Sequence, residues 1–136
     1  MANNNLLFKL ISENSCSDEV YMQLEGQAHD KQYPRAGKYT KANGLYSGMP
    51  YWIHSDGSYA LWFAKEQWRI GDKSYLGATS VYLRSTNSPL CPESFGSNWK
   101  FDNNEQFLDA QGHAKMYKYE GMIYQGNKQF INCKKS

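Results

Sequence analysis

The sequence predicts an all-β fold, a compact antiparallel sandwich or barrel built from consecutive hairpins. Segments of alternating apolar and polar residues recur along the chain, and Gly, Asn and Asp separate them at the spacing of short strands and tight turns. Helical periodicity is almost absent. The chain has 136 residues, including 11 Tyr and 4 Trp, and no linker divides it, so residues 1–136 are expected to form a single domain.

The early strands are expected to precede a central aromatic-rich segment. They lie at residues 6–11, 20–25 and 37–41. In the second of them Val20, Met22 and Leu24 alternate with polar residues or Tyr, so these three side chains are expected to point inward.

The central segment contains the best hairpin signal of the chain, the Asp56-Gly57 pair between alternating residues. We expect a type I′ turn there, because both of its central positions need a positive φ. This turn places Trp52 opposite Leu61 and Tyr51 opposite Trp62. A four-residue loop over residues 64–67 then leads to a third strand.

The register sorts the central side chains onto two faces. The face expected to be core holds Trp52, His54, Tyr59, Leu61, Phe63, Trp68 and Ile70. The other face holds Tyr51, Ile53, Ala60 and Trp62, with Arg69 across from Trp62. Because that second face places aromatic rings beside a cation, it is the candidate binding surface. The alternative is that Tyr51 and Trp62 pack beneath a second sheet layer.

The remaining strands are expected after the central segment, at residues 80–84, 98–101, 115–119, 121–124 and 129–133. Residues 87–97 contain Pro89, Pro92 and Gly96, so they are expected to form a long loop. Residues 103–110 have room for one helical turn, and residues 125–128 are expected to form the last hairpin turn.

Charge and hydropathy exclude two classes of partner. The net charge is +2 and is spread along the chain without a basic stripe, so no nucleic-acid partner is expected. No apolar stretch approaches the length that crosses a bilayer, so membrane insertion is not expected either. Cys16, Cys91 and Cys133 allow at most one internal disulfide, in any of three pairings; the alternative is three buried thiols.

Catalytic and metal chemistry have little support in the sequence. A thiol or hydroxyl nucleophile needs a base within reach, and nothing places Cys91 beside His54 or His113. No Cys or His pair has metal-ligand spacing, and the acidic run FDNNEQFLD lacks the pattern of a calcium loop. We therefore expect no enzyme, no catalytic residue, no cofactor and no metal site.

An ordered set of motifs covers roughly residues 20–105: Gly37-x-Tyr39, Asn43-Gly44, Pro50-x-Trp52, Leu61-x-Phe63, Trp68-x-Ile70-Gly71, Gly77, Tyr82, Pro92 and Trp99. This order resembles an uncharacterised β module of animal extracellular mosaic proteins. The segment between Asn43-Gly44 and Pro50 is longer here than in that module. The resemblance implies an all-β fold and secretion, and it implies no particular activity.

The function expected is carbohydrate binding by a lectin-like module, because sugar rings suit flat aromatics beside a few placed polar groups. The candidate ligand-binding residues are Tyr51, Trp62, Arg69, Asp72 and Asn98. The expected partner is a glycan or glycoprotein outside the cell, and a homo-oligomer would add avidity. Two alternatives remain: an extracellular adhesion or matrix protein that binds protein partners, and a small secreted enzyme or toxin.

Overall fold

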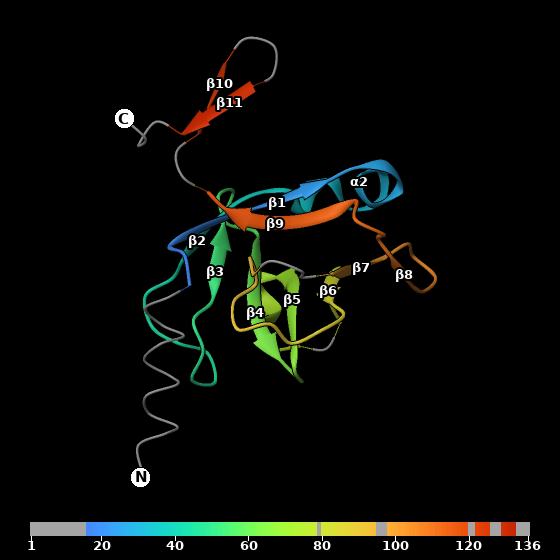
Figure 1. Cartoon of the computed structure of the whole chain (residues 1–136). Helices are drawn as coiled ribbons and strands as arrows, with labels where there is room; N and C mark the ends of the chain where they lie inside the picture. The colour runs from blue at the N-terminus through green and yellow to red at the C-terminus, as the bar shows by residue number, and fades with distance from the viewer. Residues whose placement is uncertain (1–15, 79, 95–97, 120–121, 126–128, 133–136) are drawn as a thin grey trace.

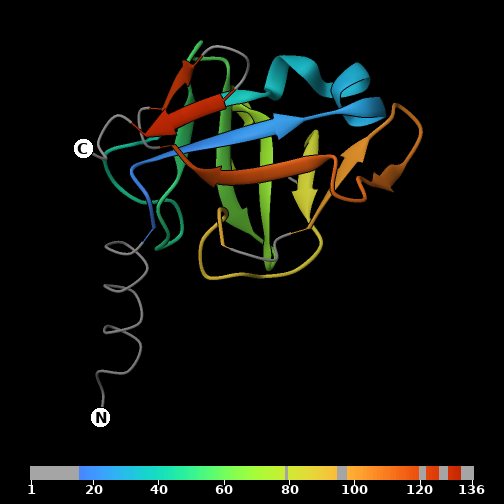
Figure 2. The ribbon, with the colours of Figure 1, turned by 45° about the horizontal axis from the view of Figure 1, so that its top comes forward.

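A computed structural model describes residues 16–78, 80–94, 98–119, 122–125 and 129–132. Its main element is one antiparallel sheet of 9 strands in the order β8-β7-β6-β5-β4-β3-β2-β1-β9. Each strand from β1 to β8 pairs with the next along the chain, and β9 returns to pair with β1. The sheet curls into a half-barrel (Figures 1 and 2), which confirms the all-β fold built from consecutive hairpins.

The elements of the main sheet are β1 (Glu19–Leu24), β2 (Gly37–Lys41), β3 (Trp52–His54), β4 (Tyr59–Ala64), β5 (Gln67–Asp72), β6 (Leu83–Ser85), β7 (Trp99–Asp102), β8 (Phe107–Asp109) and β9 (Ala114–Lys118). Three short helical elements accompany them: α2 (Gly26–Gln32), η1 (Tyr33–Arg35) and η2 (Lys73–Tyr75). A separate two-stranded sheet pairs β10 (Met122–Gln125) with β11 (Gln129–Asn132).

Most of the expected strands are present, but the one expected at residues 80–84 forms only over Leu83–Ser85, as β6. The strand at residues 37–41 is confirmed, and in β1 the side chains of Val20, Met22 and Leu24 are buried as predicted. The strand expected at residues 6–11 lies outside the described residues, as do residues 126–128 of the last expected turn.

Two local expectations were wrong. Residues 103–110 contain β8 and no helical turn, because the Asn103 side-chain oxygen accepts the backbone N–H groups of Glu105 and Gln106 and closes a hairpin turn. The helix α2 was not expected. Only Ala28 and Gln32 of that helix are buried, and the Gln32 amide anchors it by donating to the Asp102 carbonyl at 2.7 Å.

The central register is confirmed. Trp52 pairs with Leu61, Phe63 with Trp68, and Trp62 with Arg69. Trp52 and Trp68 meet edge to face with ring centroids 5.7 Å apart inside the half-barrel. The face predicted to be core therefore forms the main core, together with the inward side chains of β1.

The two central turns differ from the expected ones. At the β3–β4 turn only Gly57 has a positive φ, because the Gly57 N–H donates to the His54 carbonyl and the Asp56 carboxylate accepts the Ser58 N–H. The β4–β5 loop is shorter than predicted, since Ala64 pairs with Gln67. There Lys65 and Glu66 both have positive φ, 53° and 63°, so the type I′ geometry lies one turn later than expected.

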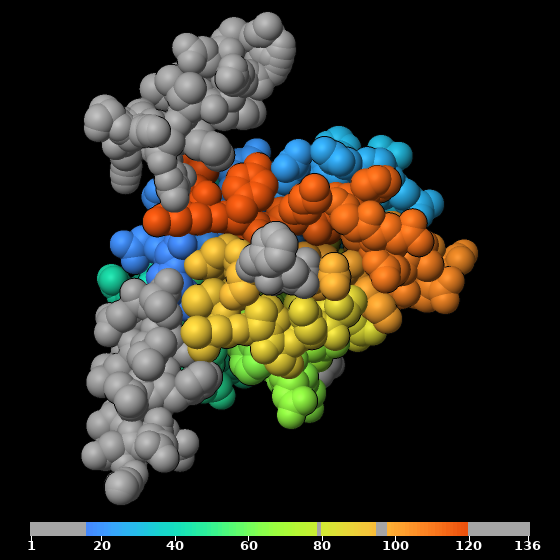
Figure 3. Space-filling view, viewed as in Figure 1, coloured from blue at the N-terminus to red at the C-terminus, as the bar shows by residue number. Residues whose placement is uncertain are grey.

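The loop after β6 lies over the concave side of the sheet. Figure 3 shows this segment in gold beside the orange β9. The Trp68 indole N–H donates to the Pro89 carbonyl at 3.0 Å, and Cys91 and Pro92 are buried. A disulfide joins Cys91 to Cys16, which lies three residues before β1 in the sequence. Cys133 lies outside the described residues. The loop is therefore part of the core packing.

Candidate functional site

The predicted aromatic face is closed. Trp62 is 0 % exposed and belongs to a second, smaller apolar cluster with Ala60 and Val81, and its cross-strand partner Arg69 is 5 % exposed. Leu76 and Val81, from the described residues between η2 and β6, pack on this face, and they belong to no strand of a second sheet. The Arg69 guanidinium donates to the Ala64 carbonyl at 3.0 Å and to the Gln67 side chain at 2.9 Å. This face therefore offers no open aromatic platform at Trp62.

The five predicted ligand-binding residues are not brought together. Tyr51 is half-buried against the outer cluster, while Asn98 is exposed beyond β6, where its carbonyl accepts the Thr86 N–H at 2.8 Å. Asp72 ends β5 and is the one member of the five that lines the described pocket. The candidate site therefore moves from the sheet face to the end of β5.

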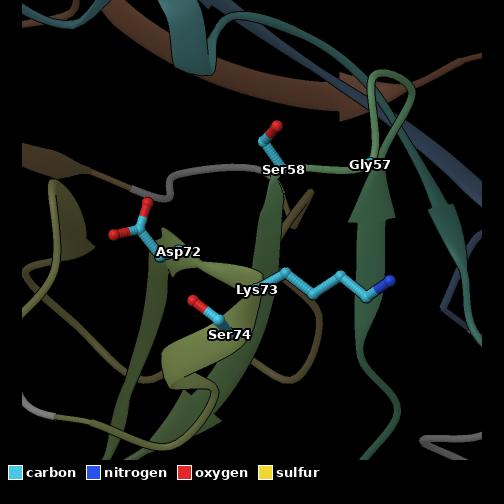
Figure 4. Close-up of a pocket in the computed structure, with 5 residues that line it drawn as sticks. All are labelled: Gly57, Ser58, Asp72, Lys73 and Ser74. Carbon is cyan, nitrogen blue, oxygen red and sulfur yellow. The ribbon is translucent and has the colours of Figure 1, made fainter.

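The pocket lies between the β3–β4 turn and η2. It has a volume of about 510 Å³ and is lined by Gly57, Ser58, Asp72, Lys73 and Ser74 (Figure 4). The Lys73 N–H donates to the Ser58 carbonyl at 2.9 Å, so one wall is tied to the other. The local fold follows from the register, because Tyr59, just after the turn, pairs directly with Asp72.

The Asp72 carboxylate is held in position from behind. The Tyr82 hydroxyl lies 3.2 and 3.1 Å from its two oxygens and donates to them. The Arg35 guanidinium packs over the Tyr82 ring at 3.5 Å from the centroid and over the Tyr59 ring at 4.7 Å. The Arg35 guanidinium thus holds the Tyr82 ring, and the Tyr82 hydroxyl orients the Asp72 carboxylate.

A buried polar layer supports this arrangement. The Tyr39 hydroxyl donates to the Arg35 carbonyl at 2.6 Å, and burial raises the pKa of Tyr39 well above its usual value. The His54 Nδ1 accepts the Asp56 N–H at 3.1 Å, so its Nε2 carries the proton that is donated to the Ala36 carbonyl at 2.7 Å. The Ser58 N–H lowers the pKa of Asp56. These bonds tie η1 and the β3–β4 turn to the core.

The pocket is suited to hydrogen bonding with a polar ligand. Figure 4 shows the Asp72 carboxylate and the Ser74 hydroxyl on one side, the Ser58 hydroxyl above them, and the Lys73 side chain extended to the other side. These groups supply both acceptors and donors. Tyr75 follows Ser74 in η2 and is 64 % exposed, so its aromatic ring is open to solvent.

Among the residues that the structure describes, no free thiol and no set of metal-binding side chains come together. Cys91 is bonded to Cys16 and presents no thiolate. Among the described residues no three His, Cys, Asp or Glu side chains gather as a metal site. The side-chain oxygens of Asp102 and Asp109 in the acidic run accept backbone N–H groups of their own turns.

Sequence reasoning found Asp72 but missed its neighbours. Ser58, Lys73 and Ser74 are ordinary turn residues in the sequence, and only the pairing of Tyr59 with Asp72 indicates that the two turns meet. The register of β4 and β5 was the available signal.

Comparisons of the chain with protein-family models, with curated proteins and with solved structures found no match. None of the helices in the described part of the chain has the length and apolar character to cross a membrane.

Proposed function

We propose that the protein is a carbohydrate-binding module whose site is the pocket between the β3–β4 turn and η2. One observation carries the proposal: the Asp72 carboxylate, whose two oxygens both lie within hydrogen-bond distance of the Tyr82 hydroxyl, lines an open pocket. Tyr75, the residue after the pocket-lining Ser74, is exposed and is the candidate aromatic contact. Vicinal sugar hydroxyls donate to a carboxylate, and the apolar face of a sugar ring packs on an aromatic ring.

The lining suits a neutral or weakly charged sugar. Asp72 supplies acceptors, Lys73 supplies donors, and the hydroxyls of Ser58 and Ser74 supply both. Because the acidic and basic groups offset each other, the pocket has no strong preference for one sign of charge. An open pocket of this size leaves much of a sugar solvated, so we expect weak single-site affinity.

The proposal places the module outside the cell. A disulfide joins Cys16 and Cys91, and disulfides persist in oxidising compartments such as the extracellular space. Secretion is therefore part of the proposal and agrees with the expected glycan or glycoprotein partner.

A glycan array followed by titration calorimetry of any sugar retained tests the proposal. Asp72→Asn removes the charged acceptor, and we expect about a 10- to 100-fold loss of affinity, because a hydrogen bond to a charged group contributes about 1.5–3 kcal/mol. Tyr75→Ala is expected to weaken binding by about tenfold. Asp30→Asn, at an exposed carboxylate of α2, is the matched control and should bind like the parent chain.

Circular dichroism melts of each variant separate binding from folding. The proposal fails if the array retains no sugar, or if Asp72→Asn, with an unchanged melt, binds a retained sugar as tightly as the parent chain does.

A further inference from the structure

A row of cations crosses the outer face of the sheet. The register pairs Arg69 with Arg84 and Arg84 with Lys100, so three basic side chains from β5, β6 and β7 lie side by side. Adjacent strands are about 4.8 Å apart, so the row spans about 10 Å. Directly opposed like charges destabilise a sheet, and this arrangement therefore needs a physical reason.

The three cations differ in their burial and in their hydrogen-bond partners. Arg69 is buried and its guanidinium is bound by the Ala64 carbonyl and the Gln67 side chain. Arg84 lies over the Phe107 ring at 4.1 Å from the centroid, and its buried Nε has no hydrogen-bond partner. Lys100 is half-buried on the next strand. The Arg84 Nε–H is thus a desolvated donor without an acceptor.

Carboxylates do not neutralise the row. Within the described part of the chain, neither Arg84 nor Lys100 has an acidic oxygen within the 4.0 Å of an ion pair. Asp109 pairs across from Lys100 and Asp102 lies two residues after Lys100, but their oxygens accept the N–H groups of Gln111 and Asn104. Both acidic groups are engaged in turns at the β8 end of the row.

We propose that this row is a binding site for a compact oxyanion, a sulfate, phosphate or carboxylate group, with Arg84 and Lys100 as its direct contacts and Arg69 as the buried charge behind them. A guanidinium held flat on an aromatic ring presents a fixed fork of donors to such a group. An anion at this position relieves the repulsion between the opposed cations and accepts from the Nη groups of the half-buried Arg84 guanidinium, whose own Nε–H is buried.

The site favours a compact anion over a polyanion. A charged polymer that ran past Lys100 would meet Asp102 and Asp109 at the edge of the sheet. A single oxyanion between Arg84 and Lys100 has the Lys100 strand position between itself and Asp109, so it meets less of that repulsion. The row also lies on the opposite face of β5 from Asp72, since residues 69 and 72 differ in parity along the strand. Its test is therefore independent of the sugar-binding proposal.

Sodium sulfate titrated into the intact protein at constant ionic strength, with chloride as the balancing salt, tests the site by nuclear magnetic resonance. We expect a saturable shift of the Arg84 Nε–H resonance, which a merely structural arginine would not show. Arg84→Gln and Lys100→Gln should each weaken sulfate binding at least tenfold, as followed by backbone resonances of β6 and β7. Lys115→Gln, at an exposed lysine of β9, should bind sulfate like the parent chain.

Parallel titrations with phosphate and acetate identify which oxyanion the site prefers. A shift that does not saturate, or that the Lys115→Gln control loses equally, would overturn the proposal. A sulfated polysaccharide or a nucleic acid that binds this face far more tightly than sulfate would overturn the compact-anion assignment.

Discussion

The indole of Trp62 occupies the space that a side chain at Gly71 would need. A Cβ placed on Gly71 would lie 2.9 Å from Trp62 Cη2 and 3.1 Å from Val81 Cγ1. Gly71 sits within β5 and its φ is not in the left-handed region, so the need for glycine is steric. The absence of a side chain here leaves room for the Trp62 ring and for Val81 to pack against the strand.

Gly71→Ala is therefore expected to destabilise the protein by about 1–3 kcal/mol, since it overpacks a closed contact. Chemical denaturation of the parent and variant measures the loss. Trp62→Phe removes the part of the ring nearest to position 71, so the double variant should lose less than the sum of the single losses. Strictly additive losses in this cycle would contradict the steric explanation.

Gly57→Ala is the matched control, because its destabilisation has a conformational cause and not a steric one. Gly57 has φ 83° and no neighbour within 4 Å, so its cost of about 1 kcal/mol is conformational. Trp62→Phe should leave that cost unchanged, because the two sites share no contact.

The Cys16–Cys91 disulfide ties the start of β1 to the loop over the concave side, across a separation of 75 residues. Closing a loop of this length restricts the unfolded chain by about 4 kcal/mol in the entropy model. Replacing both cysteines by alanine should lower the free energy of unfolding by about that amount. A reducing agent should destabilise the parent and leave the double variant unaffected; equal stability of the two proteins without reductant would count against the bond.

The parts of the fold that were predictable depend on local pattern. Alternation in β1 and in the central strands determined which side chains face the core, and the pairing of Trp62 with Arg69 followed from the expected position of the β4–β5 loop. Burial of Trp62 depends instead on Val81 packing against it, and the alternation of residues 80–84 predicted a strand there that forms only from Leu83 onward. The pocket depends on the contact of Tyr82 with Asp72, which is a tertiary hydrogen bond. The helix α2 has too few buried residues to show a period.

The β4–β5 turn is a place where the sequence conflicts with the backbone. Lys65 and Glu66 adopt φ values of 53° and 63°, which cost L-residues with a Cβ about 1 kcal/mol each. Asn-Gly suits both positions of such a turn, so the double substitution Lys65→Asn with Glu66→Gly is expected to stabilise the protein by about 1 kcal/mol. The Ser88 hydroxyl, which donates to the Glu66 carbonyl, keeps its partner in the variant.

Thermal and urea unfolding of this variant measure the gain. Glu105→Gly is the control, because Glu105 is an exposed turn residue that does not have a positive φ. Glycine there only increases the freedom of the unfolded chain, so stability should fall slightly or stay level. A gain of the same size in the control would show that the strain at Lys65 and Glu66 is not the cause.

Tyr39 makes the free energy of unfolding fall as the pH rises into the alkaline range. Burial raises the pKa of its hydroxyl well above 10.0, with the charge of Arg35 as a smaller opposing effect. In the unfolded chain the hydroxyl ionises near pH 10, whereas in the folded chain it stays neutral and donates to the Arg35 carbonyl. The contribution of Tyr39 is therefore fully present below about pH 10 and is lost as the pH rises towards the folded pKa.

Tyr39→Phe tests this dependence. At neutral pH the variant should be less stable by about 1 kcal/mol, because the Arg35 carbonyl loses its buried donor. Between neutral pH and about pH 9 the difference from the parent should be constant, and above about pH 10 it should narrow, because only the parent still has a phenol that ionises on unfolding. Urea denaturation at a series of pH values measures the difference. If it stays constant through that alkaline range, the Tyr39 hydroxyl is not held neutral by burial.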